Sequence, residues 1–142
     1  MRALLFLALI TVIAAFGNAA PAVAQEGNLP NLLGETWVRS FDLAPANLAV
    51  PDGLTQTIAF NPDGTMGGNT GCNGFGGTVA LEKGLFKPGP TRMSRRACLN
   101  TVMAAEQDYM TRIGAARQWW VRQNELHLAD GQGRPLLRFH RQ

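Results

Sequence analysis

Alternating apolar and polar residues predict that most of this chain folds into short antiparallel β-strands. In the clearest hairpin, Ile58 and Phe60 fall on one face of a strand that ends in the turn sequence Asn-Pro-Asp-Gly at 61–64. Leu126 and Leu128 show the same two-residue period near the C-terminus. The pattern predicts about seven or eight short strands, at 35–43, 56–60, 65–69, 78–81, 85–86, 118–123, 125–129 and 136–140.

A helical period is present in a single stretch, residues 100–114. Asn100 or Thr101 could cap its start, and Gly114 would end it. One helix among antiparallel strands indicates an α+β domain, with a mostly antiparallel, curled β-sheet packed against the helix. The face expected to meet the sheet, at spacings of i, i+4, i+7, i+8 and i+11, carries Val102, Glu106, Tyr109, Met110 and Ile113.

The first 24 residues have the pattern of a secretory signal peptide. Arg2 supplies a positive charge, an uncharged apolar run covers 3–16, and Ala22-Val23-Ala24 is a small-residue cleavage site. The apolar run is shorter than the roughly 20 residues of a spanning helix. We therefore expect a cut after Ala24, a flexible lead-in over 25–31, a folded domain over 32–141, and a periplasmic or secreted product with no membrane span.

The charge balance of the mature chain excludes an obvious nucleic-acid binder. Removal of Arg2 leaves 12 of the 13 basic residues against 10 acidic ones, a net charge of about +2 with mixed signs. Trp119 and Trp120 place one indole on each face of a strand, so one should be core. The other is a candidate binding surface if it is exposed. We expect a monomer with an unknown protein or apolar ligand as its partner.

Two cysteines, Cys72 and Cys98, admit three interpretations. In an oxidising compartment an isolated pair is most simply a disulfide, which would add roughly 3 kcal/mol of stability. Two buried free thiols are the second interpretation. The third is redox chemistry, because Arg92, Arg95 and Arg96 could lower the pKa of the Cys98 thiol; the absence of C-x-x-C counts against it.

The glycine-rich segment 68–77 raises the question of a phosphate-binding loop. A P-loop requires Gly-Lys-Ser/Thr after its glycines, and a dinucleotide fingerprint opens a helix with G-x-G-x-x-G. Neither pattern is present, and the following residues are strand-like. We expect the glycines to allow a sharp turn or bulge of the sheet, with Asn69 and Asn73 bonded to local backbone.

Candidate catalytic and metal-binding groups are few. The mature chain has two serines, Ser40 and Ser94, and no G-x-S-x-G. His127 and His140 fall opposite the apolar strand face and lack the neighbouring ligands of a zinc site. Glu106 is a carboxylate on an apolar helix face, so it should be paired with an arginine or a backbone N–H. The sequence predicts no catalytic residue, no metal and no cofactor.

Several segments together resemble the META domain of the HslJ heat-inducible proteins. Residues 33–37 are similar to its opening L-x-G-x-W, and 68–77 resemble G-N-x-G-C-N-x-[FY]-x-G. Residues 91–93 followed by Cys98 resemble T-[RKM]-M-A-C, with three extra residues before the cysteine. The resemblance spans about residues 30–140 and gives as motif positions Trp37, Gly68, Asn69, Gly71, Asn73, Phe75, Gly77, Thr91, Arg92, Met93 and Glu106.

The resemblance implies a compact antiparallel β domain with one helix, found in envelope or secreted proteins. Such proteins are associated with envelope stress and in some cases with antibiotic tolerance or motility, and the family offers no catalytic residues to transfer. We therefore expect a non-catalytic envelope protein that binds a protein or an apolar small molecule in the concavity of its sheet. The alternative is a small secreted inhibitor of an envelope enzyme.

Overall fold

The computed structural model describes residues 29–142. The predicted signal peptide, its cut after Ala24 and most of the predicted lead-in lie outside these residues. In chain order the elements are η1 (Leu29–Asn31), β1 (Thr36–Ser40), η2 (Phe41–Leu43), β2 (Thr57–Phe60), β3 (Thr65–Asn69), β4 (Gly74–Glu82), β5 (Leu85–Met93), α1 (Asn100–Ala115), β6 (Gln118–Arg122), β7 (Glu125–Ala129) and β8 (Pro135–Arg141).

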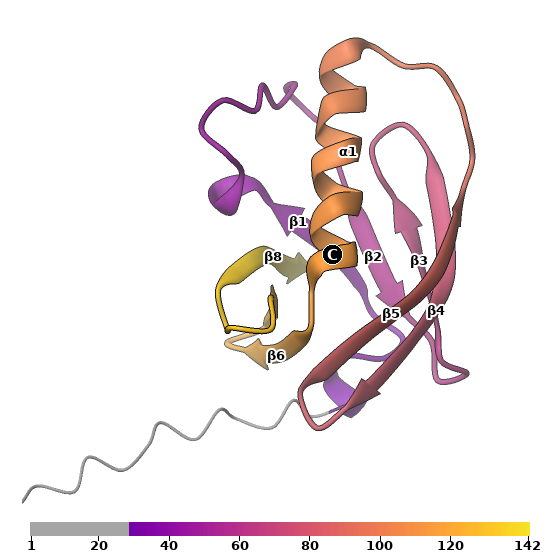
Figure 1. Ribbon diagram of the computed structural model, residues 1–142, viewed down its shortest axis with the longest axis vertical. Helices are drawn as coiled ribbons and strands as arrows, with labels where there is room; N and C mark the ends of the chain where they lie inside the picture. Colours follow the sequence, from indigo (N-terminus) through magenta and orange to yellow (C-terminus); the bar gives the residue numbers. More distant parts are fainter. Residues whose placement is uncertain (1–28) are drawn as a thin grey trace, which may run out of the picture.

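The eight strands form one antiparallel sheet that curls until it closes (Figure 1). Each strand pairs with the next, and β1 also pairs with β8, with Arg39 opposite Phe139. The α+β prediction of a curled antiparallel sheet with one helix is therefore confirmed. The weakest seam is β5–β6, where only Leu85 and Gln118 are partners, and α1 is the connection between these two strands.

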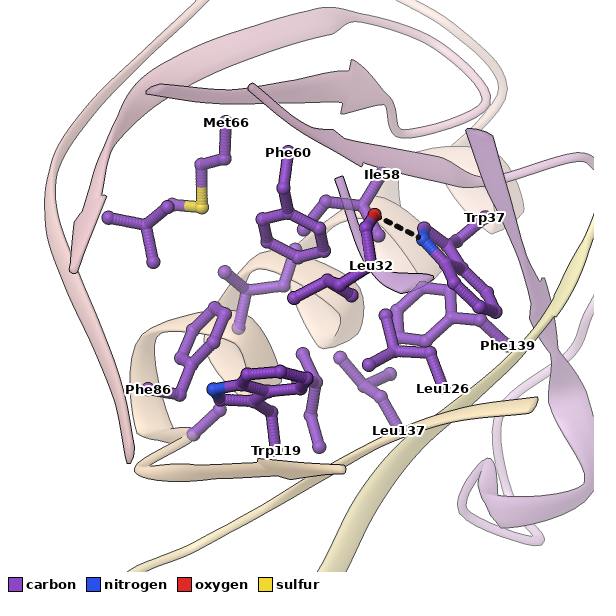
Figure 2. Packing of buried hydrophobic residues seen from close by; sticks show 14 of the residues in the cluster. Leu32, Trp37, Ile58, Phe60, Met66, Phe86, Trp119, Leu126, Leu137 and Phe139 are labelled. Atoms are coloured by element: carbon purple, nitrogen blue, oxygen red, sulfur yellow. Dashed lines mark hydrogen bonds between the residues drawn. The ribbon is translucent and has the colours of Figure 1, made fainter. Parts of the chain in front are cut away.

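The interior of the closed sheet is filled by side chains (Figure 2). Trp37 is fully buried, and its indole N–H donates to the Leu32 carbonyl at 3.2 Å. Phe60 and Phe86 meet edge to face, with ring centroids 6.1 Å apart. The expected ligand site in the concavity of the sheet is wrong, because this concavity is the hydrophobic core.

The N-terminal end of the core is closed by the segment before β1. Leu32 is fully buried in the cluster, and Leu29 and Leu33 pack against it. The Arg141 guanidinium donates to the Asn31 carbonyl at 2.9 Å. The predicted flexible lead-in is therefore wrong at its end, because Leu29–Asn31 forms a 3₁₀ turn that places these leucines on the core.

Helix α1 closes the opposite side of the core with Tyr109 and Ile113. The Tyr109 hydroxyl donates to the Thr57 carbonyl of β2 at 3.0 Å. Neither predicted cap residue caps the helix: Leu99 holds the cap position without a side-chain hydrogen bond. Gly114 does not end it either, because the helix continues for one residue. Within residues 29–142, no helix is both long and apolar enough to cross a membrane.

Three strand boundaries differ from the prediction by more than one residue. The first strand ends at Ser40, because Phe41–Leu43 turns into a 3₁₀ helix. The fourth and fifth strands are longer than expected at nine residues each. Residues 74–77, expected as part of a corner, are strand, because bare glycine backbone lets neighbouring strands approach: a Cβ on Gly77 would lie 2.7 Å from the Pro90 carbonyl oxygen.

Candidate functional site

A buried polar cluster lies where α1 meets the turn between β3 and β4. Glu106 of the helix is 7% exposed, and Asn73 of the turn is 2% exposed. The Asn73 amide donates to both Glu106 carboxylate oxygens, at 3.0 and 3.2 Å, and the Thr70 hydroxyl donates to the same carboxylate. The expectation of an arginine or backbone partner for Glu106 is wrong, since an amide and a hydroxyl satisfy it.

Asn73 also fixes the connection between β5 and α1. Its side-chain amide oxygen Oδ1 accepts from the Ser94 hydroxyl at 2.9 Å and from the Arg96 backbone N–H at 2.7 Å. Beside it, the sulfur atoms of Cys72 and Cys98 lie at bonding distance, with Cα atoms 6.1 Å apart. Residues 94–98 are therefore attached to the β3–β4 turn at two points, one polar and one through the cysteines.

A second polar network continues from this cluster along α1. Gln56 is fully buried and donates to the Thr70 carbonyl at 2.7 Å, while its oxygen accepts from Arg39 at 2.8 Å. Arg39 and Arg112 both bind the Asp108 carboxylate, at 2.6 and 2.8 Å. Burial alone would raise the pKa of Asp108, but the hydrogen bonds and charges of these two arginines outweigh it and lower that pKa.

The hydrogen bonds of these groups indicate a structural rather than a catalytic role. Both Glu106 oxygens are hydrogen-bonded within the protein, so we infer that its carboxylate anchors the helix. Ser40 Oγ lies 3.3 Å from His140 Nδ1 on the exposed surface, but within residues 29–142 no carboxylate contacts His140 to orient it. In the same part of the chain, no group of three His, Cys, Asp or Glu residues could hold a metal ion.

An open groove runs beside this cluster, between the end of β5 and the outer side of α1. A hollow of about 500 Å³ there, which we call the methionine groove, is lined by three methionines, one alanine and four polar residues: Met93, Met103, Met110, Ala104, Asn100, Glu106, Gln107 and Thr111. Met93 is 38% exposed and Met103 is 43% exposed, although most large apolar side chains are buried. A smaller hollow of about 280 Å³ shares Met93 and Met103 and is also lined by Arg95 and Arg96.

The end of the groove near residues 94–98 is electropositive. Arg95 and Arg96, which line the smaller hollow, are exposed. Arg92 is also exposed but lines a separate hollow beside Thr65 and Gly77. The ion pairs formed within residues 29–142 involve other residues, so these three guanidinium groups have no carboxylate partner there. The nearby α1 N-terminus adds partial positive charge, since its cap residue Leu99 offers no side-chain acceptor.

The tryptophan pair divides as the strand pattern predicts. Trp119 is core, at 1% exposure. Trp120 faces outward and is half-buried, and it stacks on His127 of β7 with ring centroids 5.2 Å apart and planes within 4°. Burial lowers the pKa of His127 below its usual value, against the attraction of Glu125. Trp120 as a binding surface stays a prediction.

A comparison with known protein families shows the family of this chain. The profile described as META domain matches residues 31–142, most of the chain. The chain belongs to the META domain family. A comparison with curated proteins gives no significant match.

Two solved structures share the META domain fold seen here. One is the NMR structure of a protein from Burkholderia xenovorans, at 22% identity and a TM-score of 0.64, covering 92% of this chain and 99% of the other. The other is the crystal structure of a DUF4847 family protein from Bacteroides vulgatus ATCC 8482, at 14% identity and a TM-score of 0.56, covering 77% of this chain and 93% of the other. At these identities the likeness concerns the fold alone.

The META motif residues occupy several different environments. Trp37 and Phe75 are buried in the core. Gly71 has a φ of 94° in the β3–β4 turn, where the Asn69 side chain accepts its N–H at 2.7 Å. The structure places the remaining motif glycines in the strands beside this turn and the 91–93 motif on exposed positions of β5. Asn73 and Glu106 are brought together in one cluster, while Asn69 lies outside it.

Sequence reasoning missed the methionine groove and most partners of the polar cluster. Met103 and Met110 lie seven residues apart, two helical turns, so a shared side of α1 could have been read from the sequence. The residues Ser94, Arg95 and Arg96 are the departure from the family pattern before Cys98, which was the available signal for a local feature. Gln56 and Arg39 gave no such signal, because their burial depends on contacts distant in the chain.

Proposed function

We propose that this META-domain protein is an exported, non-catalytic, monomeric protein of the cell envelope that acts in stress response or maintenance by binding a partner in the methionine groove. The carrying observation is the groove itself. Met93 and Met103 are exposed at one hollow that half-buried Met110 also lines, and apolar side chains gathered at a concave surface support a binding site. The partner is an envelope protein or an apolar small molecule.

Methionine suits such a site because its side chain is unbranched, flexible and polarizable, and so adapts to the shape of its partner. Hydrogen bonds also fix the backbone that carries the methionines of the groove. Met103 lies three residues before Glu106, whose carboxylate is bonded to Asn73 and Thr70. Met93 ends β5, directly before the pinned connection. A fixed backbone that carries adaptable side chains is a suitable basis for binding.

Export is supported by two independent features. The first is the predicted signal peptide over 1–24. The second is the Cys72–Cys98 pair at bonding distance, because disulfides persist in oxidising compartments such as the periplasm. Both fit a periplasmic or secreted protein.

Affinity capture from envelope extract tests this function. The mature protein, the variant Met103→Gln and the control Leu85→Gln would be immobilised, and bound proteins and lipids identified by mass spectrometry. Leu85 is also an exposed apolar residue, at 46%, but it lies at the other end of β5. We expect a species retained by the wild type and Leu85→Gln and lost with Met103→Gln.

Equal retention by all three proteins would overturn groove binding. Capture of one envelope enzyme whose activity the protein blocks would replace the proposal with the inhibitor alternative.

A further inference from the structure

We propose that the ligand of the methionine groove is a single-chain amphiphile with an anionic head group. Its alkyl chain lies along Met93, Met103 and Met110, and its head group binds Arg95 and Arg96. This inference rests on the proposed function, because it names the chemical class of ligand for the same site.

The continuity of the two hollows supports a ligand with an apolar and a charged end. The larger hollow is lined by all three methionines, and the smaller one shares two of them before it reaches the arginines. A molecule that spans both would bury methylene groups against the methionines at one end. It would meet guanidinium groups at the other end, which bind carboxylate or phosphate in a bidentate manner.

Charge complementarity makes the head group anionic. Arg95 and Arg96 are exposed and have no carboxylate partner within residues 29–142. Glu106 also lines both hollows, but it is nearly buried and its two oxygens already accept hydrogen bonds from Thr70 and Asn73. The Glu106 carboxylate keeps its negative charge beside both hollows, so an incoming anion would bind on the side of the smaller hollow that Arg95 and Arg96 line.

The backbone that carries the two arginines is fixed before any ligand arrives. Arg96 donates its N–H to Asn73 at 2.7 Å, and Ser94 donates its N–H to the Gly74 carbonyl at 3.0 Å. Cys98 is held beside Cys72. Both arginines therefore lie on a segment whose backbone is tied to the β3–β4 turn.

The edge of β5 argues against an extended peptide as the ligand. Beyond Phe86, whose N–H donates to the Arg117 carbonyl at 2.9 Å, no strand within residues 29–142 pairs with β5 on its β6 side. A peptide that added there as a strand would need backbone donors from β5, but Pro88 and Pro90 have no N–H. An alkyl chain makes no such demand.

Methionine methyl NMR of the mature protein tests this inference. Of the five methionines, Met1 belongs to the predicted signal peptide, so four methyl signals remain. Met66 is buried in the core and serves as an internal reference. Lauroyl lysophosphatidylglycerol, added below its micelle concentration, is expected to shift Met93, Met103 and Met110 while Met66 stays in place. Lauroyl lysophosphatidylcholine should bind at least about tenfold more weakly.

Matched charge variants locate the head group. Arg95→Gln with Arg96→Gln should weaken the anionic amphiphile about tenfold and leave the zwitterionic one unchanged. Lys87→Gln with Arg122→Gln removes the same charge from exposed positions away from the groove and should change neither. Equal affinity for the two head groups, or equal losses in both double variants, would overturn the anionic assignment.

Two further probes separate other sources of the same signals. Binding to phosphatidylglycerol vesicles without binding to the monomeric amphiphile would overturn the inference in favour of a membrane surface. Methyl shifts with hexaglutamate would overturn it in favour of an acidic peptide. Failure of every amphiphile while Met103-dependent capture from envelope extract persists would remove this inference and leave the proposed function standing, whereas loss of both would remove both.

Discussion

At the scale of single residues, Asn73 connects the most parts of the molecule. Its amide nitrogen donates to Glu106 of α1, and its oxygen accepts from Ser94 and Arg96 in the connection before α1. A truncated side chain would leave a buried carboxylate with fewer donors, and this costs more than the loss of an average hydrogen bond. A single amide thus couples the turn after β3, the helix and the arginine-bearing connection.

Asn73→Ala is expected to lower the free energy of unfolding by about 2–3 kcal/mol, because Glu106 and the Arg96 N–H lose a partner. The measurement is urea unfolding near neutral pH. Asn69→Ala is the matched control: it is another motif asparagine, but exposed, and it should cost less than about 1 kcal/mol. Equal effects of the two variants would contradict the central place given to Asn73.

Asp108 gives a pH dependence whose sign follows from its lowered pKa. Because the carboxylate is favoured in the folded state by Arg112 and Arg39, its contribution to stability is present above the unfolded pKa of about 3.9. That contribution is lost as pH falls through the lowered folded value. Asp108→Asn should therefore be less stable near neutral pH and show a shallower acid limb in unfolding experiments across pH. Parallel acid limbs would contradict the ion pair.

At the scale of elements, β4 and α1 show how much of the secondary structure can be predicted from residues close together in the sequence. The hairpin of β2 and β3 could be predicted, because apolar alternation and an Asn-Pro-Asp-Gly turn lie close together in the sequence. Gly74–Gly77 could not be recognised as strand, because glycine lacks intrinsic β preference and only the approach of neighbouring strands accounts for it. The start of α1 at Asn100 agrees with the prediction, but the expected side-chain cap is wrong, because the connection before the helix is instead held by Asn73 and Cys98.

The close approach of β3 to β2 predicts unequal costs for two glycines. A Cβ on Gly68 would clash with the Thr57 backbone and lie 3.0 Å from Ile58 Cα, so Gly68→Ala should cost at least about 2 kcal/mol. Gly76→Ala meets nothing nearer than 3.7 Å and should stay within about 0.5 kcal/mol. Thermal unfolding of both variants checks this, and similar melting temperatures would refute the packing described for β3.

The cysteine pair predicts a disulfide that joins the β3–β4 turn to the connection before α1. Denatured mature protein recovered from the exporting host should show no reactive thiol, and Cys72→Ser with Cys98→Ser should lower the unfolding free energy by about 3 kcal/mol for the 26-residue separation. Thiol titration before and after reduction supplies the first measurement and urea unfolding the second. Two reactive thiols without reduction would exclude the disulfide.

At the scale of the whole molecule, the sequence predicted the fold class and family better than the site. Strand alternation and the 68–77 motif depend on neighbours in sequence, and both indicated an antiparallel domain with one helix. Closure of the sheet depends on β1 meeting β8 across the full chain, and the groove depends on β5 meeting α1. Such long-range contacts leave no local pattern in the sequence. The sequence therefore placed the ligand site in the concavity of the sheet, which the core fills.

The proposed function requires that this META domain binds its envelope partner in the methionine groove. Methionine methyl spectra of the mature protein, recorded with lipid and protein fractions of envelope extract, test this binding. We expect at least one fraction to shift Met93, Met103 and Met110 and to leave the buried Met66 signal in place. Unchanged groove signals in every fraction, or a Met66 shift as large as theirs, would contradict it.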